Sequence, residues 1–333
     1  MRYRTFGLTD LKASEVGFGV WTLGTGWWGR IEPEDAVNLL HKAYDLGITC
    51  YDTADVYGEG AAEEVLAKAL GKHRHEITYA TKFGYDIYEH PTWQGHQERP
   101  QKWEPDFIRF ACEQSLRRLR TDYIDLYQLH NPRMPIVEKD EIFEALEGLK
   151  KEGKIRYYGV ALGPAIGWQE EGEASLKERR VTSVQTVYNL LEQDPGRAFM
   201  AIAKEAGAGI LVRVPHSSDL LTGRLTPQTV FPAGDHRSFR PKGWLSEGLK
   251  KIEKLGFLWQ DRNMTLGQAA IKYILADKTV ASVLPNITSL QELEEYALAS
   301  DRPDLTQDDL DRVADLYRNN FYLEPVAAQE KAQ

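Results

Sequence analysis

The stretch Tyr51-Asp52-Thr53-Ala54-Asp55-Val56-Tyr57-Gly58 is the most informative part of this chain, and it directly follows a short apolar run, Ile48 to Cys50. The apolar run predicts a buried strand, so Asp52 stands at the C-terminal end of that strand and Tyr57 stands in the following loop. Barrels of alternating strands and helices carry their chemistry at this end of the strands. The stretch therefore predicts a barrel strand that ends in an active site.

Two further apolar runs end in reactive side chains. Lys82 closes the run that begins at Ile77, and His130 closes the next one. A phenol is a natural acid for a carbonyl oxygen but a weak one at neutral pH, and a nearby ammonium would strengthen it by favouring the phenolate. Asp52 would hold Lys82 in place, and His130 would bind the same carbonyl oxygen as Tyr57. These residues predict a proton-transfer site on successive strand ends.

No side chain in this set supplies a hydride, so a cofactor must bring it, most simply a nicotinamide. Each residue taken alone also has a structural interpretation. Tyr57 suits packing in a loop, and Lys82 with Asp52 suits a structural ion pair. His130, before Asn131-Pro132, suits a cap at a strand end. The functional interpretation depends on all four lying on one face of consecutive strand ends.

Short β-rich runs alternate with longer helical runs along the chain, and a strand–helix unit repeated eight times predicts a parallel (β/α)8 TIM barrel. A doubly wound open sheet is the alternative, but no Gly-x-Gly-x-x-Gly follows the first strand. The predicted strands are Val16–Val20, Ile48–Asp52, Ile77–Lys82, Ile124–His130, Ile155–Val160, Ser183–Val187, Gly209–Val212 and Val280–Leu284. The clearest predicted helices are Pro33–Leu46, Ala61–Leu70, Pro105–Leu119, Lys139–Glu152 and Thr265–Ala276.

Three segments depart from this repeat. Arg2–Phe6 and Leu11–Ser14 predict an N-terminal β-hairpin that caps the bottom of the barrel. Asp86–Trp103 and His216–Trp244 are long loops after the third and seventh strands, on the predicted catalytic face. Loops of this length in a compact domain are usually functional or disordered.

The bulk composition is that of a soluble globular protein. Hydrophobic residues make up 42% of the 333, and 41 Lys and Arg against 50 Asp and Glu leave a net charge of −9. This acidity argues against nucleic acid or an anionic membrane as a partner. Without a signal-peptide core or a bilayer-spanning run, we expect a cytoplasmic protein with one domain over residues 1–326 and a disordered tail over 327–333.

The cysteines and histidines suggest no metal site. Cys50 and Cys112 are the only cysteines, and we expect free buried thiols because both lie in apolar-periodic segments. No spacing of His and Cys typical of zinc occurs, so no metal is expected. The residues interpreted as solvated or loop residues are Asp55, His73, His75, His90 and His96.

A series of ordered motifs connects the chain to a known family. Beside the opening stretch they are Gly17-Phe18-Gly19-Val20-Trp21, Ala80-Thr81-Lys82, Ser115-Leu116-Arg117-Arg118-Leu119, Leu129-His130-Asn131-Pro132, Gly153-Lys154-Ile155-Arg156-Tyr157-Tyr158-Gly159-Val160, Tyr188-Asn189-Leu190-Leu191 and Leu220-Leu221-Thr222-Gly223-Arg224. With these motifs the chain resembles the aldo-keto reductase superfamily, in its branch of bacterial general reductases and potassium-channel β-subunit-like proteins. The resemblance implies a (β/α)8 barrel and NAD(P)H-dependent reduction of an aldehyde or ketone. The implied catalytic tetrad is Asp52, Tyr57 (the acid), Lys82 and His130.

The resemblance also implies where a cofactor would bind. The first-strand loop and one glutamine would meet the nicotinamide, the loop after the seventh strand would cover the pyrophosphate, and the segment after the eighth strand would hold the adenosine. The cofactor-binding residues carried over in this way are Gly19, Val20, Trp21, Asp52, Gln185, Arg213, Pro215, His216, Ser217, Ser218, Leu220, Arg224, Asn286, Thr288, Glu292, Glu295 and Tyr296.

Two departures from the family pattern lie at the nicotinamide end. The fifth strand ends in Ala161-Leu162 instead of a polar pair, so one contact to the carboxamide is missing. Arg213 stands where an aromatic residue usually stacks on the nicotinamide ring. Its charge would disfavour the oxidised, cationic ring and favour the direction of reduction.

Further departures lie at the adenosine end. Thr288 stands where the family usually has an arginine, and Glu292 where it usually has a glutamine. Both changes weaken the case for a 2′-phosphate, although Thr288 with Arg237 or Arg240 would still be able to serve one. NADP(H) is the preferred cofactor expectation, and NAD(H) is the alternative.

The substrate pocket is expected among the strand-end loops, with Trp27, Trp28, Tyr57 and His130 in direct contact with a small carbonyl compound. A sugar-derived aldehyde is the first candidate, from the resemblance. The sequence does not predict an oligomeric state. We expect about half of the aromatic candidates only to anchor loops by packing. The other pocket candidates are Tyr85, Trp93, Trp103, Trp168 and His216.

Two functions from other classes compete with this one. A nucleotide-binding regulatory subunit with little or no turnover is known among the channel β-subunits, but a complete tetrad favours turnover. A metal-dependent barrel isomerase or hydrolase needs clusters of His or carboxylates on several strand ends, and here only Asp52 and His130 stand there.

Overall fold

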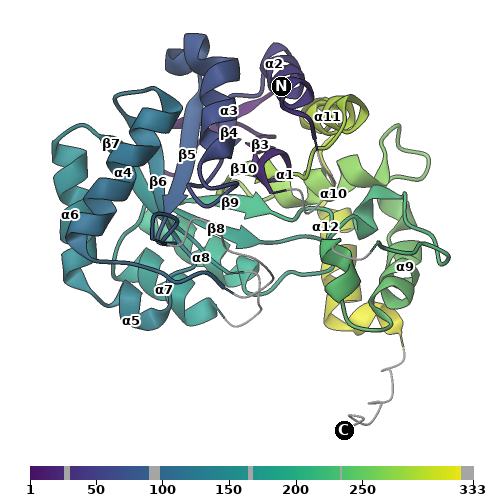
Figure 1. Cartoon of the computed structure of the whole chain (residues 1–333). Coiled ribbons are helices and arrows are strands. Elements are labelled where there is room, and N and C mark those ends of the chain that lie inside the picture. Colours follow the sequence, from purple (N-terminus) through teal and green to yellow (C-terminus); the bar gives the residue numbers. More distant parts are fainter. Residues whose placement is uncertain (26–30, 90–97, 164–167, 233–234, 324–333) are drawn as a thin grey trace, which may run out of the picture.

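Eight parallel strands form the centre of the computed structural model, which describes residues 1–25, 31–89, 98–163, 168–232 and 235–323. The hydrogen-bonded order runs without interruption from β3 to β10, and a parallel bridge between Val16 and Val283 brings the two edges together. The result is a nearly closed (β/α)8 barrel, which confirms the predicted fold class (Figure 1). The strands are β3 (Phe18–Gly19), β4 (Cys50–Asp52), β5 (Thr78–Phe83), β6 (Ile124–His130), β7 (Ile155–Ala161), β8 (Ser183–Val187), β9 (Gly209–Arg213) and β10 (Val280–Leu284).

Helices follow the strands and surround the barrel (Figure 1). Pro33 and Pro105 begin their helices, as expected for a residue whose missing N–H costs nothing in the first turn. The helices are α1 (Trp21–Gly24), α2 (Pro33–Asp45), α3 (Ala61–Leu70), α4 (Pro105–Leu119), α5 (Met134–Val137), α6 (Asp140–Lys151), α7 (Gln169–Lys177), α8 (Gly196–Ala206), α9 (Trp244–Lys254), α10 (Leu266–Leu275), α11 (Leu290–Ala297) and α12 (Gln307–Arg318). Among the helices of the described residues, none has both the length and the apolar character needed to cross a bilayer.

The predicted hairpin closes the bottom of the barrel. Strands β1 (Tyr3–Thr5) and β2 (Lys12–Ser14) pair in antiparallel fashion, with Tyr3 opposite Ser14. Gly7 has a φ of +54° and its Cα lies so close to the Gly207 carbonyl that a side chain would collide with it. Buried residues of the hairpin and of the strand interiors form one cluster, which we call the apolar plug: Phe6, Leu11, Ala13, Cys50, Ala80, Leu126, Leu211, Ala281 and Leu284.

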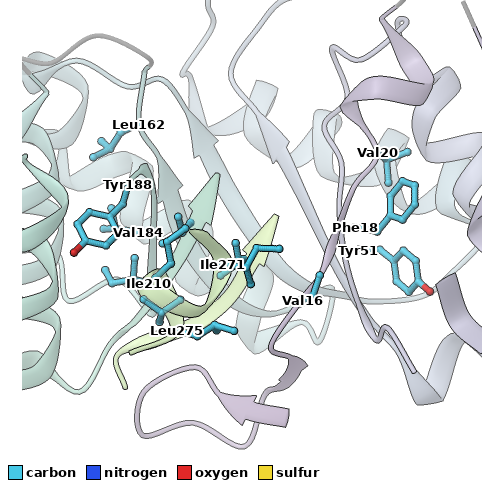
Figure 2. Close-up of a cluster of buried hydrophobic side chains, with 14 of the residues drawn as sticks. Val16, Phe18, Val20, Tyr51, Leu162, Val184, Tyr188, Ile210, Ile271 and Leu275 are labelled. Carbon is cyan, nitrogen blue, oxygen red and sulfur yellow. The ribbon is translucent and has the colours of Figure 1, made fainter. Parts of the chain in front are cut away.

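A second, larger apolar layer lies between the strands and the helices. It takes the strand residues that alternate with those of the plug, because successive side chains of a strand point to opposite faces. Figure 2 shows Phe18 beside Tyr51 in one part of this layer, and Ile210 near Ile271 of α10 in another. Cys112 belongs to this layer and Cys50 to the plug, and both are free buried thiols as expected.

Alternation along the strands also places the polar side chains. Asp52, Lys82, Gln128 and Arg213 each follow a plug residue by two positions on the same strand, so they point inward at the C-terminal end of the barrel. The plug fills the lower barrel, and the polar residues occupy the level above it. This position is where the candidate active site lies.

The described parts of the two long loops contact the barrel or form short helices. Tyr85 pairs with Gln101, and Trp103 packs over Gly84, whose φ of +131° and lack of a side chain allow the contact. The loop after β9 contains two short 3-10 helices, η2 (Leu220–Thr222) and η3 (His236–Phe239). Four further short 3-10 helices are η1 (Gly71–Glu76), η4 (Gly256–Leu258), η5 (Leu298–Asp301) and η6 (Asn320–Tyr322).

Candidate active site

Lys82 of β5 is fully buried and is the centre of the site. Its ammonium donates to Asp52 Oδ1 at 2.6 Å, to the Thr53 carbonyl at 2.7 Å and to the Tyr57 hydroxyl at 3.3 Å. Burial by itself would lower the pKa of this ammonium, but the Asp52 carboxylate and the Tyr57 phenol outweigh it and raise the pKa. A fixed positive charge therefore lies within hydrogen-bonding distance of the phenol oxygen.

Asp52, the last residue of β4, is held from three sides. Beside the ion pair with Lys82, its Oδ2 accepts from the amide of Gln128 at 3.2 Å and from the amide of Gln185 at 2.8 Å. The amides come from β6 and β8, so two strands that do not neighbour β4 help to fix the carboxylate. With its second oxygen held by these two donors, the Asp52 carboxylate keeps Lys82 oriented.

His130, the last residue of β6, faces Tyr57 edge-on. The two ring centroids are 5.9 Å apart, and the ring of Tyr85 meets the imidazole from another side at 5.0 Å. Burial lowers the pKa of His130 well below its usual value, and the charges of Lys82 and Arg213 lower it further. The imidazole is therefore neutral at physiological pH, and it can donate one N–H to a carbonyl oxygen beside the phenol.

A cavity of about 600 Å³ opens above these residues at the C-terminal ends of the strands. Nearly every strand contributes to its wall, together with the loops after β8 and β9. Its lining consists of Gly19, Trp21, Asp52, Tyr57, Tyr85, His130, Asn131, Ala161, Leu162, Gln185, Val187, Glu192, Arg213, Val214, Ser218, Arg240, Pro241, Leu284 and Asn286.

The residues expected at the nicotinamide end divide into those that line the cavity and those that do not. Gly19, Trp21, Gln185 and Asn286 line the cavity, as a contact with a ligand requires. Val20 is fully buried in the layer between strands and helices and is not part of the cavity lining (Figure 2).

The segment from Val214 to Asp219, in the loop after β9, contains several residues with left-handed backbone conformations. Ser217, Ser218 and Asp219 have φ values of 47°, 54° and 70°, which non-glycine residues rarely adopt. His216 Nε2 lies 3.1 Å from the Gly267 carbonyl and its ring packs on Tyr296. Burial lowers the pKa of His216 to about 4, so its side chain is neutral and packs under the loop. Leu220 is also buried and packs beside Gly248. Pro215 is also buried.

The expected adenosine end contains an internal ion pair. Arg224 Nη1 lies 2.5 Å from Glu292 Oε1, and its Nη2 donates to the hydroxyl of Tyr296 at 3.0 Å. The other oxygen of Glu292 accepts from both the backbone N–H and the hydroxyl of Thr288, at 2.7 and 2.8 Å. Glu295 accepts from the hydroxyl of Thr265. The guanidinium of Arg224 and the two donors of Thr288 are thus all bound to one carboxylate of the chain itself, that of Glu292.

The aromatic candidates for the substrate pocket fall into three groups. Tyr85 lines the cavity. Trp103 and Trp168 pack in the core against Phe83 and below Arg133, and His216 packs on Tyr296, so these three anchor structure. Three further candidates, Trp27, Trp28 and Trp93, lie outside the described residues, as do His90, His96 and the predicted tail.

Some residues of the site were not predicted from the sequence. Gln128, which donates to Asp52, stands two positions before His130 on β6, so strand alternation alone would have placed it on the same inner face. Glu192 and Asn131 lie in loops, where periodicity carries no signal. Asn131 has a φ of 56°, which suits the residue type but is not visible in the sequence.

Asp55 was interpreted as a solvated or loop residue; it does lie in a loop, but it is not solvated. Its side chain is fully buried, and neither carboxylate oxygen has a hydrogen-bond partner among the described residues. Burial raises the pKa of Asp55 well above its usual value, and the neighbouring Glu63 raises it further. Glu63 itself binds Arg118 and Thr81, at 2.6 Å each. Full burial without a hydrogen-bond partner among the described residues therefore favours the neutral form of the Asp55 carboxyl.

With this geometry in place, comparison with known proteins is informative. A family model described as Aldo/keto reductase family matches residues 15–318. This chain belongs to the aldo/keto reductase family. Within the described ranges of this reductase, no group of three or more His, Cys, Asp or Glu side chains is arranged to hold a metal ion.

Similar proteins and similar solved structures align with nearly the whole length of the reductase chain. The uncharacterized oxidoreductase YqkF of Bacillus subtilis (strain 168) is 31% identical over 327 residues, which cover 97% of this chain and 98% of the relative. The NADH-specific methylglyoxal reductase of Escherichia coli (strain K12) is 28% identical and covers 90% and 93%. The holo form of aldo-keto reductase AKR11C1 from Bacillus halodurans is 31% identical, with a TM-score of 0.79 and coverage of 99% of both chains.

Family membership, oxidoreductase relatives and the barrel together make this protein an NAD(P)H-dependent oxidoreductase of the aldo-keto reductase type. The family resemblance predicted from the sequence is confirmed. Reductases of this family use a nicotinamide cofactor and act on small carbonyl compounds.

Proposed function

We propose that this reductase converts an aldehyde or ketone to an alcohol, with Tyr57 as the general acid. The observation that carries the proposal is the Tyr57 hydroxyl, 3.3 Å from the buried Lys82 ammonium and edge-on to a neutral His130 in one cavity. The ammonium lies where it can stabilise the negative charge left on the phenol oxygen after proton transfer. Tyr57 and His130 together can donate two hydrogen bonds to one carbonyl oxygen.

The cofactor, when bound, supplies the hydride that the carbonyl carbon accepts. The carbonyl oxygen takes the phenolic proton from Tyr57, and the phenolate is later reprotonated from solvent. Asp52 keeps the Lys82 ammonium charged and in place, and Gln185 and Gln128 keep Asp52 in place. The cavity fits a nicotinamide, since it combines the inner barrel face with the loop donors after β9.

We propose NAD(H) as the preferred cofactor, although the sequence favoured NADP(H). A 2′-phosphate would need cations, and Arg224 is paired with Glu292, whose charge would repel it. The two loop arginines considered for the same task are also paired. Arg237 contacts Asp219 and Asp235, and Arg240 faces Glu192 at 3.7 Å.

The substrate we propose is a small, polar aldehyde, with a sugar-derived one as the first candidate. The cavity of about 600 Å³ has to hold the nicotinamide as well, which leaves room for few substrate atoms. Relatives point to the same class: one is an L-glyceraldehyde 3-phosphate reductase of Escherichia coli (strain K12), 28% identical, and another is the methylglyoxal reductase. A structural neighbour is the glycerol dehydrogenase AKR11B4 from Gluconobacter oxydans, 27% identical with a TM-score of 0.80.

Replacement of Tyr57 by phenylalanine tests the proposed acid. We expect carbonyl-dependent NADH oxidation to fall by about 10² or more, because the variant keeps the ring but loses the proton donor. NADH binding, followed by quenching of tryptophan fluorescence, should stay within about threefold of wild type. A kcat close to that of wild type would rule out Tyr57 as the acid.

Glu292→Gln tests the cofactor preference. Removing the carboxylate frees Arg224 and Thr288 for a phosphate, so the affinity for NADPH should rise by about tenfold while that for NADH changes little. Glu294→Gln, an exposed change on the same helix, is the matched control. Equal effects of Glu292→Gln on both cofactors would place its carboxylate away from the ribose.

A further inference from the structure

Arg213 is a charged side chain in the wall of the cavity, and the proposed mechanism leaves it without a role. It is the last residue of β9 and shares the inner face with Leu211 of the apolar plug. Its Nη2 donates to the carbonyl oxygen of Leu162 at 2.7 Å, which ties the guanidinium to the end of β7. The charge is therefore fixed in position at the level of the catalytic residues.

The charges around the cavity do not cancel. Asp52 is paired with Lys82 at 2.6 Å, and Glu192 faces Arg240 at 3.7 Å. Among the described residues, no carboxylate lies within 4.0 Å of the Arg213 guanidinium, whereas the two other cations each have one. With His130 neutral, one positive charge remains among the described residues around the cavity, and it belongs to Arg213.

Burial removes part of the hydration of the Arg213 charge. Burial lowers the pKa of Arg213, and the polar groups that offset the burial are Tyr57, Asp52, Tyr85 and Glu192. The same group of residues surrounds the catalytic end of the cavity. A guanidinium stays protonated even so, because its ordinary pKa lies above 12.

We propose, resting on the function above, that Arg213 makes this site bind the reduced nicotinamide in preference to the oxidised one. The oxidised ring carries a positive charge and the reduced ring is neutral. The ring has to lie in this cavity, because its hydride-donating carbon must approach a carbonyl carbon whose oxygen is held by Tyr57 and His130. The pyrophosphate charge is the same in both forms and cancels from the comparison.

The size of the effect follows from Coulomb's law. At any separation of about 6 to 10 Å and an effective dielectric constant of about 20, two positive charges repel enough to change an affinity by about ten- to a hundredfold. The preference sets a direction for the reaction. The site holds the hydride donor and releases the oxidised product, so carbonyl reduction is favoured over alcohol oxidation.

The test compares dissociation constants of NADH and NAD⁺ by tryptophan fluorescence and calorimetry, without substrate. If NADPH and NADP⁺ bind more tightly than NADH and NAD⁺, they are compared with each other instead. We expect wild type to bind the reduced form at least about tenfold more tightly, and Arg213→Gln to lower this ratio by about tenfold. Arg213→Lys keeps the charge and should keep the ratio.

Arg197→Gln is the control for net charge, because Arg197 lies on the surface in an exposed pair with Asp194. Arg213→Met serves in place of the glutamine variant if that variant does not fold. Equal affinities of wild type for the two redox forms would overturn the proposal, and so would a ratio that Arg213→Gln or Arg213→Met leaves unchanged. Binding of neither form would instead refute the proposed function, and this proposal with it.

Discussion

Lys82→Met examines the centre of the site, because methionine has a similar length but carries no charge. The change removes the three hydrogen bonds from the ammonium to Asp52, Thr53 and Tyr57. The Asp52 carboxylate stays buried and keeps only the amides of Gln128 and Gln185 as donors. Two separate losses follow, one of stability and one of catalysis.

The loss of stability has a size that the structure indicates. Removing one partner of a buried ion pair costs about 3–5 kcal/mol, since the other charge is left uncompensated. The two amide donors still stabilise Asp52, so we expect a value near the lower limit, about 3 kcal/mol. Catalysis should fall by about 10² to 10⁴ in kcat, the range in which general acids contribute.

The double variant Lys82→Met with Asp52→Asn separates the two effects. With neither charge present, no carboxylate is left uncompensated, so at least half of the lost unfolding free energy should return. Activity should stay low, because nothing stabilises the phenolate of Tyr57. Urea unfolding measures the first quantity, and steady-state NADH oxidation with an aldehyde measures the second.

Two results would refute this reasoning. A kcat of Lys82→Met within tenfold of wild type would make Lys82 a structural residue. A double variant no more stable than the single one would show that the uncompensated Asp52 charge was not the cause of the loss.

Two further predictions concern buried acids. Asp55→Asn should stabilise the protein by about 1–3 kcal/mol at neutral pH. The raised pKa means that folded Asp55 binds its proton more tightly than the unfolded chain does, so wild type loses stability as pH rises above about 4, and the variant does not. Identical pH profiles between pH 5 and 8 would contradict this. Arg262→Gln should cost about 1–2 kcal/mol at neutral pH, because Arg262 donates twice to Asp309 at 2.7 Å and lowers the pKa of that carboxyl to about 2. The folded pKa lies below the unfolded one, so the difference between variant and wild type in thermal unfolding should vanish as pH falls from about 4 to 2.

Much of the fold was predictable because its signals are local. Each strand from β3 to β10 overlaps an expected apolar run, and α3 and α4 match their predicted bounds. The first and last residues of the strands were predicted less well, and β3 and β4 are shorter than the apolar runs that predicted them. Parallel neighbours in a barrel end at the same face, so Asp52, Lys82 and His130 were expected together from three separate stretches.

Partners in space were not predictable in the same way. Nothing around Asp55 in the chain shows that charges of Glu63 in α3 and Arg118 in α4 act on it. The loop position suggested exposure to solvent, whereas the folded chain buries the side chain completely. Trp103 and Trp168 illustrate the reverse case, because an aromatic residue in a loop has the same sequence signal whether it lines a pocket or fills the core.

By itself, the sequence determined the order of strands and helices and the face on which each strand side chain lies. It did so because the apolar period of a strand or helix is a property of neighbouring residues. Only the tertiary structure decided which charges are compensated. Arg224 meets Glu292 across 68 positions of chain, and Arg213 meets a carbonyl oxygen and no described carboxylate. Such pairings depend on contacts between distant segments, and these contacts separate a cation with an internal partner from one that faces the ligand.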